Sequence, residues 1–125
     1  MFTSERVAIE TLQGGVVQER RDARKSFDGH TMNMPWDPLH RAYFNGYALR
    51  LYLTTPFFMA MPGFELTEIE PWKEGGETWR ELRARFPEHI ATHSREQDFY
   101  FGADGLVRRH DYHIDVAGGF AAAQL

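Results

Sequence analysis

Four side chains suited to acid–base or metal chemistry lie within six residues near the end of the chain: His110, Asp111, His113 and Asp115. Alternation along a strand places Asp111, His113 and Asp115 on one face. His110 then falls on the opposite face. A histidine beside two carboxylates can bind a divalent metal, but no motif such as HExxH accompanies this group. We therefore favour a solvated strand face balanced by charge pairs, and we expect neither a metal nor another cofactor.

The same cluster supports an enzyme hypothesis. A carboxylate that hydrogen-bonds to an imidazole orients the ring and raises its basicity. His110 would be the base, and Asp111 or Asp115 would be the acid that orients it. The enzyme would then be a hydrolase, isomerase or cyclase that acts on a hydrophobic substrate.

A second pair of histidines precedes this cluster. His89 and His93 are four residues apart, so they would share a face if residues 87–94 formed a short helical turn. Because the segment is short and polar, we interpret His93 and Ser94 as capping or surface residues. Half of a metal site or a serine nucleophile is the less favoured interpretation.

The element that must position these groups is a helix after Asp37. Asp37 is a favourable N-cap, Pro38 suits the first helical position, and Pro56 disfavours helix at Thr55. Between them the apolar residues go most of the way round the helix. Such a helix spans a membrane or is enclosed by other structure, and charged residues within fewer than about 20 apolar positions argue against a membrane span.

Strand patterns occupy most of the remaining chain. Alternating or apolar segments at 6–12, 16–21, 64–72, 78–86, 97–101 and 106–116 predict about six strands. Residues 102–105 (GADG) predict a hairpin turn, and 118–125 (GGFAAAQL) have no strand pattern. In the first hairpin, placing Gln13 and Gly14 at the turn sets Glu10 opposite Val17. We prefer this register because the alternative sets Glu10 against Glu19.

These elements predict an α+β fold in a single domain, residues 1–125. Because the connections are short, neighbouring strands should be antiparallel. We expect a curved antiparallel sheet, a half-barrel of about six strands, wrapped around one long apolar helix. A flat α+β layer is the alternative, and it would leave part of the helix exposed unless two chains pair.

Composition narrows the partners. The net charge of −4, with acids and bases interspersed, provides no broad basic surface for nucleic acid. The absence of cysteine excludes disulfides and thiolate catalysis. With no transmembrane segment or leader pattern, we expect a cytoplasmic protein.

Four runs carry a resemblance: TPFFMAMPGF (55–64), GETWRELRARFP (76–87), IATHSREQDFYF (90–101) and GLVRRHDYHIDVAGG (105–119). They resemble a bacterial family of uncharacterised proteins, whose members are longer at both ends. This resemblance implies a shortened version of a longer half-barrel. The expected architecture is also similar to the LolA and LppX kind of lipoprotein carrier, in which a cavity between sheet and helix holds acyl chains.

The leading functional hypothesis is the binding of a hydrophobic, lipid-like or polyketide-like small molecule between sheet and helix. Arg80 and Arg108 could face the cavity and pair with an anionic head group, but pairing with an acidic residue is the favoured interpretation. The acidic residues considered are Glu68, Glu70 and Asp98. A homodimeric module that buries its apolar surplus between two chains is a further alternative. The expected lining consists of Tyr43, Tyr47, Leu51, Phe58, Phe99, Tyr112 and Arg108.

Overall fold

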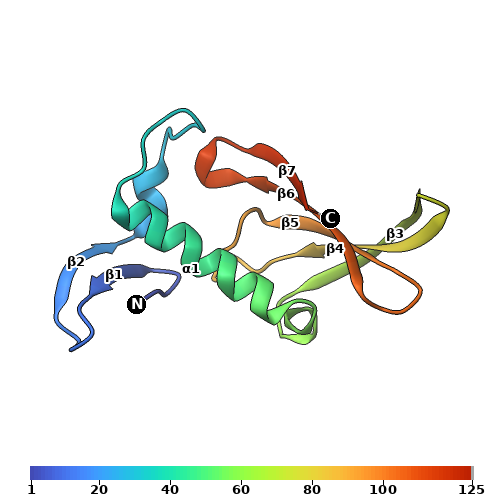
Figure 1. Ribbon diagram of the computed structural model, residues 1–125, viewed down its shortest axis with the longest axis horizontal. Helices are drawn as coiled ribbons and strands as arrows, with labels where there is room; N and C mark the ends of the chain where they lie inside the picture. The colour runs from blue at the N-terminus through green and yellow to red at the C-terminus, as the bar shows by residue number, and fades with distance from the viewer. Residues whose placement is uncertain (125) are drawn as a thin grey trace.

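A computed structural model describes residues 1–124 and shows an α+β fold with one α-helix, three short 3-10 helices and two antiparallel sheets (Figure 1). The first sheet is a hairpin of β1 (Arg6–Glu10) and β2 (Val16–Arg21). The second has the order β3-β4-β5-β6-β7, with bounds Glu65–Glu74, Glu77–Arg85, Glu96–Phe101, Val107–Ile114 and Phe120–Gln124. The helices are η1 (Ala23–Phe27), α1 (Pro38–Thr54), η2 (Phe57–Ala60) and η3 (Asp115–Ala117).

The start of α1 is fixed by a capping box. The Asp37 carboxylate accepts a hydrogen bond from the backbone N–H of His40 at 2.7 Å, and the Asp37 N–H donates to Nδ1 of His40 at 3.2 Å. Both oxygens of Asp37 also pair with the guanidinium of Arg20, at 3.1 and 2.6 Å. The helix ends at Thr54, just before Pro56, so its predicted limits are confirmed.

The sheet does not wrap around α1. It remains open, and α1 lies along one of its faces (Figure 1). The other side of the helix is uncovered, with 58% of Leu49 and 81% of Leu53 exposed. The prediction of a half-barrel of about six strands was therefore only partly right, because seven strands form and β1 and β2 pair apart from the others. The exposed part of the helix agrees with the alternative of an open α+β layer.

The strand pairings test the predicted registers. Ala8 lies opposite Glu19 and Ile9 opposite Gln18, as the preferred register requires. A shift after Ile9 then sets Glu10 opposite Val16 rather than Val17. The hairpin at residues 102–105 joins β5 to β6 as predicted.

The segment 118–125 was wrongly predicted to lack a strand. Its residues Phe120–Gln124 form β7, which pairs with β6 from Ile114 to His110. Alanine and glutamine have little preference for strands, so the sequence pattern was silent, and pairing with an existing strand supplied the order. Leu125 lies outside the described residues.

Two apolar clusters hold α1 in place. The first half of the helix packs with β1, η1 and η3, and the second half packs on the sheet through Leu51, Phe58 and Phe99. Tyr43 and Tyr47 belong to the first cluster. None of the helices within residues 1–124 has the length and apolar character needed to cross a membrane.

Removing the Asp37 side chain should destabilise the protein in a pH-dependent way. Asp37→Ala should lose about 1 kcal/mol of unfolding free energy at neutral pH, as for other N-cap aspartates. The Arg20 side chain and the His40 N–H lower the folded pKa of Asp37 from 3.8 to about 2. The stabilisation is therefore present above the unfolded pKa and is lost as pH falls through the folded one.

Urea unfolding of wild type and Asp37→Ala between pH 2 and pH 7 measures this difference, which should shrink at the acidic end. Asp28→Ala removes another exposed aspartate and is the matched control. If the difference in unfolding free energy between wild type and Asp37→Ala were unchanged at low pH, the charge of the Asp37 carboxylate would not be the source of the stabilisation.

Candidate functional site

Two buried histidines meet between α1 and the sheet. His93, in the loop between β4 and β5, is 0% exposed, and His110, in β6, is 6% exposed. Tyr112 bridges them, with ring centroids 4.2 Å from His93 and 4.5 Å from His110. Tyr47 of α1 packs edge-on against His93 at 5.2 Å. The helix therefore covers an imidazole pair whose members are 17 residues apart in the chain.

His110 is held by an amide rather than by a carboxylate. Its Nε2 donates to Oε1 of Gln97 at 2.7 Å. The amide nitrogen of Gln97 donates in turn to Oγ1 of Thr92 at 2.7 Å and to the carbonyl oxygen of Ser94 at 2.8 Å. These bonds connect β6, β5 and the loop before β5, so the orientation of His110 depends on all three.

Tyr52 links the last turn of α1 to the same cluster. Its hydroxyl lies 3.1 Å from Nε2 of His93, and Nε2 of Gln124 in β7 donates to it at 3.4 Å. The Tyr52 hydroxyl therefore joins the end of α1 to the edge strand β7 and to His93.

Burial controls the charge of the cluster. Desolvation, followed by the positive charge of Arg24, lowers the pKa of His93 to about 4. Desolvation, followed by repulsion from His93, lowers the pKa of His110 to about 4. Burial also raises the pKa of Tyr112 to about 12, with a further contribution from its hydrogen bond to Tyr52. At pH 7 all three side chains are neutral.

Two polar atoms of this cluster are buried without a hydrogen-bond partner among residues 1–124: the hydroxyl of Tyr47 and Nδ1 of His93. An unpaired buried group costs about 1–3 kcal/mol, and such groups are few in natural cores. The cluster therefore carries more hydrogen-bonding capacity than its packing uses.

An open pocket of about 310 Å³ reaches His110 from solvent. Phe99 and Val107 give it apolar walls, while Tyr52 and Gln124 supply polar groups at its edge. We call this the His110 pocket. Its full lining is Tyr52, Thr55, Phe99, Val107, Arg108, Arg109, His110 and Gln124.

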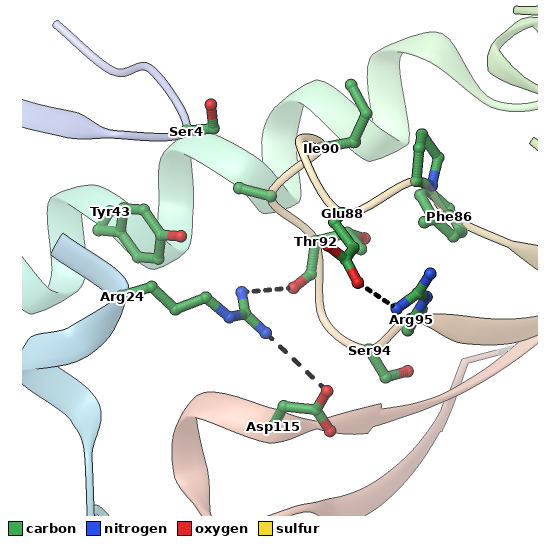
Figure 2. Close-up of a pocket in the computed structure, with 12 residues that line it drawn as sticks. Ser4, Arg24, Tyr43, Phe86, Glu88, Ile90, Thr92, Ser94, Arg95 and Asp115 are labelled. Carbon is green, nitrogen blue, oxygen red and sulfur yellow. Dashed lines mark hydrogen bonds and ion pairs between the residues drawn. The ribbon is translucent and has the colours of Figure 1, made fainter. Parts of the chain in front are cut away.

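A second pocket, of about 210 Å³, lies beside η1 (Figure 2). Arg24 donates to the carbonyl oxygen of Thr92 at 3.0 Å and lies 3.9 Å from the carboxylate of Asp115. Glu88 and Arg95 form another ion pair there, at 2.8 Å. Figure 2 shows these charges directed toward one another, so they join η1, η3 and the loop before β5.

The structure divides the predicted ligand-binding residues. Phe99 and Arg108 line the His110 pocket, and Tyr112 packs against the ring of His110. The other four are buried in the core: Leu51 and Phe58 where α1 and η2 pack on the sheet, and Tyr43 and Tyr47 in the cluster that α1 forms with β1, η1 and η3. The cavity beside Leu51 and Phe58 is only about 30 Å³, roughly the share of liquid volume of one water molecule.

The structure separates the predicted acid–base cluster. Asp111 lies on the other face of β6, where Arg109 donates to it at 2.7 and 3.0 Å and the Tyr100 hydroxyl at 3.0 Å. Asp115 lies beyond the strand in η3, near Arg24, and His113 is exposed. The predicted pairing of His110 with an aspartate is not formed. Among residues 1–124, no three histidine or acidic side chains are placed to hold a metal.

The predicted pairing with acidic residues is confirmed for Arg80, whereas Arg108 has other partners. Arg80 donates to Glu68 at 2.8 Å, as the favoured interpretation required. Arg108 donates to Asp104 at 2.7 Å, across the hairpin turn, rather than to the acidic residues considered from sequence.

Sequence reasoning missed His93 and Gln97. His93 was interpreted as a surface or capping residue in a helical turn, but residues 87–94 form no helix and His93 is fully buried. The one available signal was the absence of Asp, Glu, Lys and Arg between Ile90 and Ser94. Gln97 gave no signal, because its role depends on the pairing of β5 with β6.

Comparison with known proteins found no matching family model, no matching curated sequence and no matching solved structure.

Acidification should destabilise the protein through the two buried histidines. Their folded pKa values, about 4, lie below the ordinary 6.5, so the unfolded chain takes up protons first. The contribution of the two neutral histidines to the free energy of unfolding should therefore be complete above pH 6.5, and the free energy of unfolding should decrease as pH falls toward 4. Urea unfolding across this range, with NMR titration of each imidazole, measures the effect. Protonation of either folded histidine above about pH 6 would contradict the assignment.

Proposed function

We propose that this protein binds a small hydrophobic molecule of aromatic or polyketide-like size in the His110 pocket. The observation that carries the proposal is an open pocket with apolar walls that ends on a buried histidine. Ligand sites typically combine an apolar lining with a few convergent polar groups, as Tyr52, His110 and Gln124 do here.

The volume of the pocket narrows the ligand class. At about 310 Å³ it is near the lower limit of ligand sites, which range from about 300 to 1,000 Å³. A compact ring system suits this space better than a long acyl chain. The packed residues Tyr47 and Leu51 support the same choice, because they occupy the volume that an acyl chain would need.

Arg108 favours a ligand whose main contacts are uncharged. Its guanidinium already pairs with Asp104 at 2.7 Å and lies 3.8 Å from Glu77. An anionic head group would have to compete with both carboxylates. Binding energy would therefore come mostly from the apolar walls and from hydrogen bonds to neutral groups.

Binding is favoured over catalysis by the state of His110. A histidine whose pKa is about 4 is a weak base at neutral pH, and its partner is the amide of Gln97 rather than a carboxylate. We therefore retain the hydrolase, isomerase or cyclase hypothesis as the alternative.

Filling the pocket should block binding. Val107→Trp places a large ring at the partly exposed edge of the His110 pocket and should weaken the binding of naphthol at least tenfold. NMR titration measures the affinity and maps the site, and the shifted signals in wild type should include those of Tyr52, Val107 and Gln124.

Val17→Trp is the matched control, since Val17 is an exposed strand valine in the other sheet. It should leave naphthol binding unchanged. Binding that is unaffected by Val107→Trp, or that maps to the pocket around Arg24, would contradict the proposal.

A second candidate function is self-association through the uncovered side of α1. Leu49 and Leu53 are one helical turn apart and exposed, and Phe57 follows them with 78% of its surface exposed. A neighbouring chain could cover these three side chains. This observation favours the homodimer hypothesis made from the sequence.

Sedimentation velocity over a range of protein concentrations measures this association. Wild type should show a mass that rises with concentration. Leu53→Glu should remain monomeric, because burial of an unpaired carboxylate in the interface would cost much free energy. Leu106→Glu, at the exposed hairpin tip, is the control. A wild-type monomer at all concentrations would exclude this candidate.

A further inference from the structure

The amide of Gln97 determines which nitrogen of His110 carries its proton. Nε2 of Gln97 lies 2.8 Å from the carbonyl oxygen of Ser94, an atom that only accepts hydrogen bonds. The nitrogen end of the amide is therefore fixed on the side of Ser94. Its oxygen faces Nε2 of His110 at 2.7 Å, and this short bond requires a proton on Nε2.

The neutral ring of His110 consequently has a free lone pair on Nδ1. Within residues 1–124, Nδ1 of His110 has no hydrogen-bond partner, and it is not among the buried polar atoms left unpaired. It is therefore not fully enclosed, and His110 lines the His110 pocket. Nδ1 is the hydrogen-bond acceptor that His110 can offer to this pocket.

The surroundings of the ring specify what can approach this acceptor. The ring of Phe99 stacks on that of His110, with centroids 4.3 Å apart and planes 14° apart. Phe99 is also one of the apolar residues that line the His110 pocket. No acidic side chain of the described residues lines the pocket, so an ammonium donor would find no partner for its charge there. A neutral hydroxyl on an otherwise apolar ring meets both conditions.

We propose that the ligand of the His110 pocket is a hydroxy-aromatic compound whose hydroxyl donates a hydrogen bond to Nδ1 of His110. Gln97 is the positioning residue, because it holds the ring in the tautomer that leaves Nδ1 unprotonated. This inference rests on the proposed function and adds to it the chemical group that the site selects.

The tautomer can be measured without a ligand. Long-range proton–nitrogen NMR on the full chain distinguishes an imidazole protonated at Nε2 from one protonated at Nδ1. We expect His110 to be protonated at Nε2 at neutral pH. Protonation at Nδ1 would overturn the inference, whatever the protein binds.

The selected group can be measured with two probes, naphthol and its methyl ether. The ether keeps the ring but has no proton to donate. Wild type should bind naphthol about tenfold more tightly, the value of one neutral hydrogen bond. In His110→Phe, an aromatic ring can still stack on Phe99, but neither ring nitrogen remains and there is no acceptor in the place of Nδ1. The two probes should then bind with similar affinity.

His113→Phe is the matched control, because it makes the same change at an exposed histidine of the same strand. It should retain the preference for naphthol. Equal binding of both probes to wild type would overturn the hydroxyl inference while leaving small-molecule binding in place. If neither probe bound, the proposed function and this inference would both be overturned.

Discussion

The burial of His93 and His110 between α1 and the sheet is the constraint on which the site depends. Burial beneath the helix lowers the pKa of both imidazoles, so both are neutral at pH 7 and lie close together without charge repulsion. The capping box at Asp37 fixes where α1 begins, and the packing of Leu51 on the sheet fixes how it lies. Together these contacts place Tyr52 beside His93, so the position of the helix determines one contact of the histidine cluster.

Local signals were sufficient to predict the elements but not their assembly. Asp37, Pro38 and Pro56 mark the ends of α1 through backbone chemistry that is present in the sequence itself. The like-charge argument at Glu10 likewise predicted most of the first hairpin register. Whether a sheet closes around a helix depends on strand number and pairing partners, so no local pattern indicated that β1 and β2 would separate from the others.

The candidate site was predictable only in its single residues. His110 was identified from its type, and alternation correctly separated it from Asp111. Its actual partner, Gln97, is 13 residues away and reaches it because Phe99 and His110 are opposite each other in the β5–β6 pair. Such partnerships follow from strand register, and several acceptors for one imidazole remain possible until that register is known.

The segment with the weakest sequence signal has a direct effect on the pocket. β7 is mostly alanine, yet it places Gln124 opposite His110 and within reach of the Tyr52 hydroxyl. The His110 pocket takes part of its lining from β7, through Gln124, and part from the end of α1, through Tyr52. Phe99 and Tyr112 pack against the ring of His110 and hold it in place. An apolar wall beside a neutral acceptor would select a ligand by one hydrogen bond rather than by charge, which is the basis of the function proposed for the His110 pocket.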